Sequence, residues 1–321
     1  MMHVLSLQEL TGEQIMQLVK KAIDIKKHPE NYYHACFRKG LLMLFQKTST
    51  RTMLSFHSGI AQMGGYAVLM DWNNSNFSIS PIQYEARYVS TNCDVIMARL
   101  KKHSDLQELA KYSLVPVING CCEKFHPTQA LADLMTIYEV AGTFQGVTLT
   151  YVGIHNNIAN SLVQACIKVG MKLNLVTPIV NESSWDESLM KEAENSGLVT
   201  RTTDLAQAVC ESNFIYTDTW IDMEYFNDPS YEQERNVRIK TMSKYQLNRQ
   251  NLQGFTPCIM HDMPIHPGYE IEEELIEAPE SIIYTQAENR MHAEKALLLH
   301  LLQAENSKVE GGPVHQVELT I

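Results

Sequence analysis

Short apolar runs alternate with amphipathic, helix-like segments along most of this chain of 321 residues. In the first half, the apolar runs lie at 40–46, 66–71, 94–100 and 115–120. Between them, apolar residues recur at helical spacing. Such alternation is typical of βαβ units, in which helices join parallel strands and cover the sheet. The pattern therefore predicts an α/β fold built on parallel sheets.

The alternation pauses at a long amphipathic helical pattern, 126–142, and then resumes as far as residue 264. A single hydrophobic core rarely grows beyond roughly 250–300 residues, so a chain of this length favours two domains. We predict two doubly wound parallel-sheet domains joined by interdomain helices. The predicted domains are residues 1–140 and 141–286.

The end of the chain has a pattern of its own. An apolar run at 281–285 is predicted to be a strand, and a strong helical pattern at 287–305 follows it. Because no strand comes after this helix, we predict that it packs back on the first domain. Residues 306–321 are mostly polar and are predicted to form a terminal tail.

Composition limits the class of protein. Hydrophobic residues make up 45% of the chain and charged residues 20%, which is ordinary for a globular protein. A formal net charge of −11 without a long basic run argues against nucleic acid or an anionic membrane as partner. No segment reaches the roughly 18 apolar residues of a membrane helix. Seven scattered cysteines without a Cys-x-x-Cys pair favour reduced thiols, no metal site and a cytoplasmic location.

The segment Phe45–Phe56 reads FQKTSTRTMLSF and places four hydroxyl side chains around Arg51 at the start of a predicted helix. These side chains belong to Thr48, Ser49, Thr50 and Thr52. A helix N-terminus offers unpaired N–H groups and a positive dipole end, so hydroxyls and a guanidinium there favour an oxyanion. The alternative is a Ser/Thr helix cap beside a surface arginine.

Polar side chains also stand at or after the ends of later predicted strands. In chain order they are Arg99, His126, Gln129, Asn156, Asn157, Asp218, Asp222, His261 and Asp262, and the apolar Met223 follows Asp222. Ligands of open parallel sheets bind beyond the carboxyl ends of the strands, so we predict that these groups meet in one interdomain cleft. Taken singly, each could be a cap, a surface charge or a turn residue.

The predicted donors fit an acyl phosphate, because one set can hold a phosphate and the other a neighbouring carbonyl oxygen. The sequence has no GxGxxG after a strand and no lysine in a Gly-rich phosphate loop. Kinase and dehydrogenase functions that depend on a nucleotide are therefore disfavoured.

Four segments together carry a family resemblance: FQKTSTRTMLSF, VPVINGCCEKFHPTQALADL, YTDTW and QAENRMHAEKAL. In this order they resemble the aspartate/ornithine carbamoyltransferase family, and within it the ornithine carbamoyltransferases, over roughly residues 5–302. The resemblance implies a carbamoyl phosphate-binding first domain, an amine-binding second domain and no metal or organic cofactor. It also implies a homotrimer with active sites near subunit interfaces.

The resemblance implies a role for each matching residue. The phosphate would lie against Ser49, Thr50, Arg51 and Thr52. The carbamoyl group would be held by Arg99, His126, Gln129 and Arg290, with the backbone around Asp262 and Met263 receiving its amide. The amine substrate would meet Asn157, Asp218, Asp222 and Met223. Of these residues, Arg51, Arg99, His126, Gln129, Asp218 and Arg290 are the predicted catalytic set.

The amine side departs from the family pattern. Asp222 and Glu224 stand where serine and glycine are usual, Asp262 replaces a cysteine, and Pro81 replaces a serine in the loop expected to reach a neighbouring subunit. Added carboxylates would favour a more cationic acceptor than ornithine. Alternatively, they point away or pair with Lys or Arg, and ornithine remains the substrate.

Three functions follow from these observations. The first is transfer of the carbamoyl group of carbamoyl phosphate to L-ornithine or a closely related amine, which gives citrulline or another ureido product and phosphate. The second is carbamoylation of a different amine in a specialised pathway. The third is a non-catalytic binding or assembly role, which the retained arginines and histidine disfavour.

Overall fold

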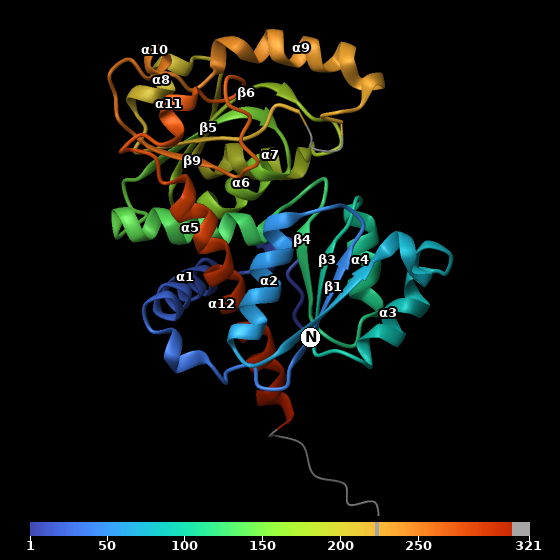
Figure 1. The fold of residues 1–321 in the computed structure, drawn as a ribbon. Helices are drawn as coiled ribbons and strands as arrows, with labels where there is room; N and C mark the ends of the chain where they lie inside the picture. The colour runs from blue at the N-terminus through green and yellow to red at the C-terminus, as the bar shows by residue number, and fades with distance from the viewer. Residues whose placement is uncertain (222–224, 310–321) are drawn as a thin grey trace, which may run out of the picture.

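The computed structural model describes residues 1–221 and 225–309, with side chains as far as residue 303. Predictions that concern Asp222, Met223 and Glu224, and most of the predicted tail, lie outside the described residues. Two parallel sheets, each with its own helices, make up the described chain (Figure 1). The predicted α/β fold with two parallel-sheet domains is confirmed.

The first sheet has four parallel strands in the order β2-β1-β3-β4. Its strands are β1 (Gly40–Phe45), β2 (Tyr66–Asp71), β3 (Val95–Arg99) and β4 (Val117–Cys121). Its accompanying helices are α1 (Gly12–Lys27), α2 (Thr50–Gln62), α3 (Ile82–Ser90) and α4 (His103–Tyr112). β1 and β4 are buried along their whole length, as is typical of parallel strands covered on both faces. β2 is an edge strand and remains largely exposed.

The second sheet has five parallel strands in the order β7-β6-β5-β8-β9. Its strands are β5 (Thr148–His155), β6 (Lys172–Val180), β7 (Val199–Thr202), β8 (Phe214–Thr217) and β9 (Cys258–His261). Its helices are α6 (Asn157–Val169), α7 (Glu187–Ser196), α8 (Leu205–Cys210), α9 (Glu232–Met242), α10 (Arg249–Leu252) and α11 (Glu273–Ile276). β5 lies at the centre of this sheet and is buried along its whole length.

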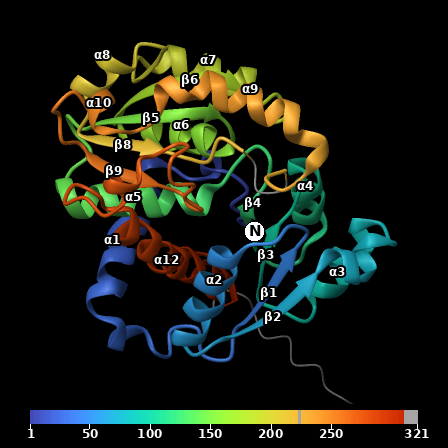
Figure 2. The ribbon, with the colours of Figure 1, turned by 45° about the horizontal axis from the view of Figure 1, so that its top comes forward.

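Helix α5 (Pro127–Ala141) lies between the two sheets, packed against α1, α6 and α12 (Figures 1 and 2). Residues 127–137 are all buried, so this helix has no solvent face over most of its length. The sequence pattern predicted an amphipathic helix with one exposed face. The observed helix differs from this prediction because both domains and the last helix cover it, so the polar residues among its apolar ones lie inside the protein.

Helix α12 (Ile283–Val309) is the last described element and contacts α1, α2 and α5 of the first domain. The strand predicted at 281–285 is wrong, because the helix begins at Ile283 and only Ser281 forms an isolated bridge, with Ile259. A short apolar run cannot distinguish a strand from the first turn of a buried helix. The longer helix brings Gln286 and Arg290 to the centre of the molecule.

Candidate active site

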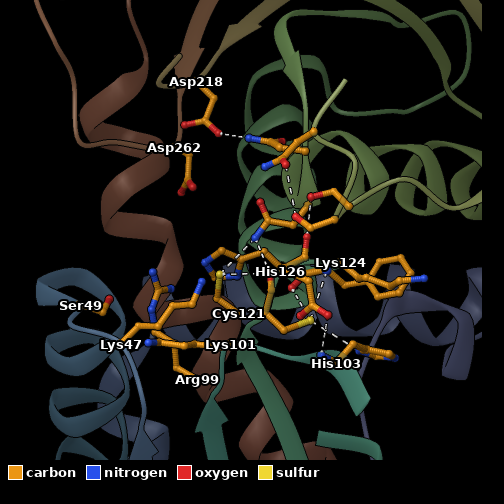
Figure 3. A pocket seen from close by; sticks show the side chains of 18 of the residues that line it. Lys47, Ser49, Arg99, Lys101, His103, Cys121, Lys124, His126, Asp218 and Asp262 are labelled. Atoms are coloured by element: carbon orange, nitrogen blue, oxygen red, sulfur yellow. Dashed lines mark hydrogen bonds between the residues drawn. The ribbon is translucent and has the colours of Figure 1, made fainter. Parts of the chain in front are cut away.

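A cleft of about 1230 Å³ lies where strands of both sheets end. The ends of β1, β3 and β4 reach it from the first domain, and those of β5, β8 and β9 from the second. Figure 3 shows Asp218 and Asp262 together in one part of this pocket and Lys47, Arg99 and Lys101 in another. Ten residues with a predicted substrate role line the cleft: Ser49, Arg51, Thr52, Arg99, His126, Asn157, Asp218, Asp262, Met263 and Arg290. Asn156, also predicted to lie there, lines the cleft as well, whereas His261 does not.

The Ser-Thr-Arg-Thr segment is both a helix cap and part of the cleft wall. Ser49 is the N-cap of α2 and its hydroxyl accepts a hydrogen bond from the backbone N–H of Thr52 at 3.2 Å. Nη2 of Arg51 donates to the carbonyl oxygen of Met263 at 2.7 Å, across the domain boundary. Burial lowers the pKa of Arg51, with further effects from neighbouring charges. Thr50 is exposed and does not line the cleft.

Arg290 of α12 joins three elements at the cleft. Its Nη2 donates to the hydroxyl of Thr52 at 2.9 Å, and its Nη1 donates to Gln129 Oε1 and to Asp262 Oδ1, the latter at 3.2 Å. Its side chain is almost completely buried. Gln129 does not line the cleft, since its amide nitrogen donates to Asp133 at 2.8 Å and its amide oxygen accepts from Arg290. Gln129 therefore acts on the cleft indirectly, by orienting Arg290.

His126 and Arg99 provide donors at a second point of the cleft. His126 is the N-cap of α5, and its backbone N–H donates to the hydroxyl of Ser161 at 2.8 Å. Burial, followed by the charges of nearby arginines, lowers the pKa of His126 well below its ordinary value. The imidazole is therefore neutral near pH 7 and can donate only one hydrogen bond. Arg99 ends β3 at the cleft.

Asp218 lies on the second-domain side. Its carboxylate accepts hydrogen bonds from Asn156 Nδ2 at 2.8 Å and from the backbone N–H of Thr219 at 2.7 Å. Burial, and then the charge of Asp262, raise the pKa of Asp218 to about 7. The amide nitrogen of Asn157 donates to the carbonyl of Cys122 at 2.7 Å, so it holds the end of β4. Asp222 and Met223, also predicted on this side, lie outside the described residues.

Asp262 combines the two behaviours considered for it from the sequence. It lines the cleft, where its charge contributes to the raised pKa of Asp218, and it also pairs with Arg290 at 3.2 Å. The salt bridge with Arg290 partly neutralises the Asp262 carboxylate, although the charge of Asp262 still raises the pKa of Asp218. The next residue, Met263, has a left-handed backbone with φ of 65° and directs its carbonyl oxygen to Arg51.

The described lining residues include eight Lys and Arg but only four Asp and Glu, in a protein of net charge −11. Five of these cations were given no substrate-binding role from the sequence: Lys47, Lys101, Lys102, Lys124 and Arg238. Lys47 lies within the quoted FQKTSTRT segment, and Lys101 and Lys102 follow the predicted strand at 94–100. The rule that ligands bind beyond the carboxyl ends of strands therefore already placed these three lysines at the cleft. The arrangement can bind an anion. Among the described residues, no group of three or more His, Cys, Asp or Glu side chains could hold a metal ion.

Two α/β domains with strand ends that converge on one cation-rich cleft define a class of two-substrate enzymes, in which one domain can hold an anion and the other its reaction partner. The chain belongs to the aspartate/ornithine carbamoyltransferase family. The family model for the carbamoyl-P binding domain matches residues 2–139, and the model for the Asp/Orn binding domain matches residues 145–301.

Individual relatives agree with this family membership. The chain is 37% identical to an ornithine carbamoyltransferase of Archaeoglobus fulgidus over 316 residues, 95% of this chain and 99% of the relative. It is 38% identical to one from Listeria monocytogenes over 94% of this chain and 96% of the relative. The solved structure of ornithine carbamoyltransferase from Pyrococcus furiosus matches with a TM-score of 0.85 and 36% identity, covering 94% of this chain and 97% of that one.

No helix among the described residues has the length and apolar character needed to span a membrane.

Proposed function

We propose that the protein transfers the carbamoyl group of carbamoyl phosphate to the side-chain amine of L-ornithine or a closely related amine. The products would be citrulline or another ureido compound and phosphate. The observation that carries this proposal is the convergence of Arg51, Arg99 and Arg290 on one cleft that also holds Asp218. Residues 1–140 would bind carbamoyl phosphate and residues 141–286 the amine, as the family models for the two halves suggest.

In the proposed reaction, the neutral amine nitrogen attacks the carbamoyl carbon, a C–N bond forms, and the bond from that carbon to the phosphate oxygen breaks. Arg51, with Ser49 and Thr52, would hold the phosphate as it gains charge. Arg99 and His126 would donate to the carbonyl oxygen, which becomes negative in the tetrahedral intermediate. The amine gives up a proton as the C–N bond forms, and the departing phosphate can accept it.

Arg290 and Asp218 would position the two substrates. Arg290 is already oriented by Thr52, Gln129 and Asp262, so little reorganisation would be needed when carbamoyl phosphate binds. Asp218 would hold an ammonium group of the acceptor. A role for Thr50 would have to come from its backbone, since its side chain is exposed.

The direct test is a panel of amines, L-ornithine among them, assayed with carbamoyl phosphate for phosphate release. Turnover of L-ornithine well above the rate without amine would support the proposal. Absence of phosphate release with every amine, from protein that binds carbamoyl phosphate, would favour the non-catalytic role instead.

A second candidate function is carbamoylation of an amine that carries more positive charge than ornithine. The observation that favours it is the position of Asp262 in the cleft, close enough for its charge to raise the pKa of Asp218. Two neighbouring carboxylates attract an additional ammonium and repel an α-carboxylate. The pairing of Asp262 with Arg290 reduces this effect, so the amine panel decides between the candidates.

The raised pKa of Asp218 leads to a pH prediction. If ionised Asp218 holds the acceptor, kcat/KM should increase as the pH rises through about 7, where the free enzyme loses this proton. Asp262→Asn removes a negative neighbour, which should lower the pKa of Asp218 and move this increase to lower pH. The acceptor's own ionisation is the same for both enzymes, so the displacement between the two profiles is the measurement. Coincident profiles would contradict the assignment.

We also propose a homotrimer, with the segment at 72–82 near a neighbour's cleft, as the family resemblance implies. Large apolar side chains exposed on the first domain support this proposal. They are Leu54 of α2, Tyr66, Val68 and Leu69 of β2, Ile79, and Tyr84 and Tyr88 of α3. Exposed apolar side chains that gather on one surface commonly mark protein interfaces.

All seven cysteines are free thiols, which supports the proposed cytoplasmic location.

Leu69→Glu is predicted to convert the trimer to monomers and to reduce activity strongly, because the charge would be buried in the interface. Sedimentation velocity measures the change in mass. Val237→Glu, which alters an equally exposed apolar residue on α9 of the second domain, is the matched control and should remain trimeric. A fully active monomeric wild-type protein would refute the proposed assembly.

A further inference from the structure

Asp133 lies on α5 one turn after Gln129 and is completely buried. Its Oδ1 accepts two hydrogen bonds from side-chain amides, one from Gln129 Nε2 at 2.8 Å and one from Gln286 Nε2 at 2.7 Å. Neither Asp133 nor Gln286 lines the cleft. A buried carboxyl group that receives two amides, behind a reactive cleft, needs an explanation beyond packing.

The amide group of glutamine has one donor end and one acceptor end, so fixing one end fixes the other. Because both NH₂ groups face Asp133, both amide oxygens face away from it. The oxygen of Gln129 accepts from Arg290 Nη1, and the oxygen of Gln286 accepts from the backbone N–H of His261 at 2.8 Å. Asp133 therefore makes the amide oxygen of Gln129 face Arg290 and the amide oxygen of Gln286 face the backbone of His261.

These contacts close into a ring. From Asp133 it passes through Gln129 to Arg290, then through the 3.2 Å contact to Asp262, which is bonded in the chain to His261. His261 returns through Gln286 to Asp133. The ring joins α5, α12 and the end of β9, and thus both domains. The carbonyl of Met263, which accepts from Arg51, lies one residue outside it.

We propose that Asp133 is a positioning residue for the carbamoyl group: through Gln129 and Gln286 it fixes Arg290 and the backbone of residues 261–263. This inference rests on the proposed function. Asp133 touches no substrate in the proposed arrangement and acts only through the groups that it orients. Its place in the ring explains why a polar side chain stands at a buried position of α5.

The protonation state of Asp133 indicates which substitution should preserve the hydrogen bonds of the ring. Burial raises the pKa of Asp133 to about 8, so its carboxyl group is mostly protonated near pH 7. The charges of Asp262 and Arg290 act on it from the cleft side, and Cys166 of α6 and Tyr216 of β8 interact with it from the second domain. Since the two glutamines need only the acceptor oxygen Oδ1, asparagine offers the same acceptor without charge.

The experiment compares Asp133→Leu with Asp133→Asn in steady-state assays of phosphate release with the best acceptor of the panel. Asp133→Leu should lower kcat about tenfold and leave the acceptor KM within about twofold, because Asp218, the residue proposed to hold the acceptor, is outside the ring. Asp133→Asn should keep kcat within about threefold. Thr136→Val is the matched control, since Thr136 is also buried on α5 and accepts from Asn289 of α12 at 2.9 Å outside the ring.

Thermal denaturation of each variant separates positioning from stability. The proposal would be overturned if Asp133→Leu and Thr136→Val had equal Tm values and equal losses of kcat. It would also be overturned if Asp133→Leu folded and kept its kcat unchanged. If Asp133→Leu does not fold, Gln286→Leu breaks the same ring from α12 and should show the same split between kcat and acceptor KM. Because the residues of the ring act together, the double variant Asp133→Leu/Gln286→Leu should lose little more kcat than the worse of the two single variants.

A wild-type protein without turnover would refute the proposed function but leave the ring testable. Calorimetry with a non-hydrolysable phosphonate analogue of carbamoyl phosphate then provides the measurement. Its Kd should rise about tenfold in Asp133→Leu and remain unchanged in Thr136→Val. An unchanged Kd in both variants would refute the positioning role.

Discussion

Replacing Arg51 by alanine is expected to lower kcat at least about 10²–10³-fold while the protein remains folded. A preorganised donor at a developing charge typically contributes an effect of this size. Arg51 is held at the cleft by its bond to Met263, and its guanidinium can give two parallel hydrogen bonds to a phosphate. The neighbouring hydroxyl of Thr52 is uncharged and has a single donor, so it is a poor substitute for the lost guanidinium.

Arg51→Lys should also lose much of the activity, because a point charge lacks the planar fork of arginine. Circular dichroism and Tm establish that each variant is folded. The matched control is Arg201→Ala, which removes an exposed guanidinium that stacks over Trp185 at 5.0 Å, outside the cleft. Normal kcat in folded Arg51→Ala would exclude the phosphate role.

The architecture was predictable because it depends on patterns that are local in the sequence. Residues 41–45 and 95–98 within the predicted strands are apolar throughout, since parallel strands covered on both faces expose no side. Ligands of parallel sheets bind beyond the carboxyl ends of the strands, so the sequence placed Arg51, Arg99 and Asp218 at one cleft without knowledge of any distance. Both steps use only the order of elements along the chain.

The direction in which each polar group points was not predictable in the same way. Gln129 was expected to hold the carbamoyl group directly, yet its amide is occupied by Asp133 and Arg290. Asn157 was expected to face the amine, yet its amide nitrogen faces the carbonyl of Cys122. These orientations depend on partners far away in the sequence, which no spacing rule encodes. The same holds for Gln286, which lies 153 residues from Asp133.

The exposed apolar residues of β2 show a second limit of prediction from sequence. The apolar run at 66–71 indicated a strand, but its pattern matches that of the buried strands and does not predict an edge. Exposure of Val68 and Leu69 becomes apparent only when the sheet order places β2 outermost. A sequence that predicts strands well can therefore leave the interaction surface undetermined.

The second large effect concerns the choice of acceptor. Asp262→Cys, alone or together with Asp222→Ser, restores the residues usual in the resembled ornithine carbamoyltransferases and is expected to raise kcat/KM for L-ornithine relative to a decarboxylated diamine. At an effective dielectric near 20, a charge at about 4 Å contributes roughly 4 kcal/mol before screening. The salt bridge between Asp262 and Arg290 reduces this value. We expect a change in the substrate ratio of about 10- to 100-fold.

The measurement must be a ratio between two substrates in the same variant. Loss of Asp262 also removes one of the contacts that orient Arg290, so both rates should fall, and the ratio cancels this common loss. The control is Asp186→Asn, which removes a carboxylate that also lines the cleft but pairs with Lys124 at 3.5 Å. This control should leave the ratio unchanged. If Asp262→Cys leaves the ratio unchanged as well, the Asp262 carboxylate does not select the acceptor. The reason to prefer a more cationic amine over ornithine is then lost, and ornithine becomes the favoured substrate.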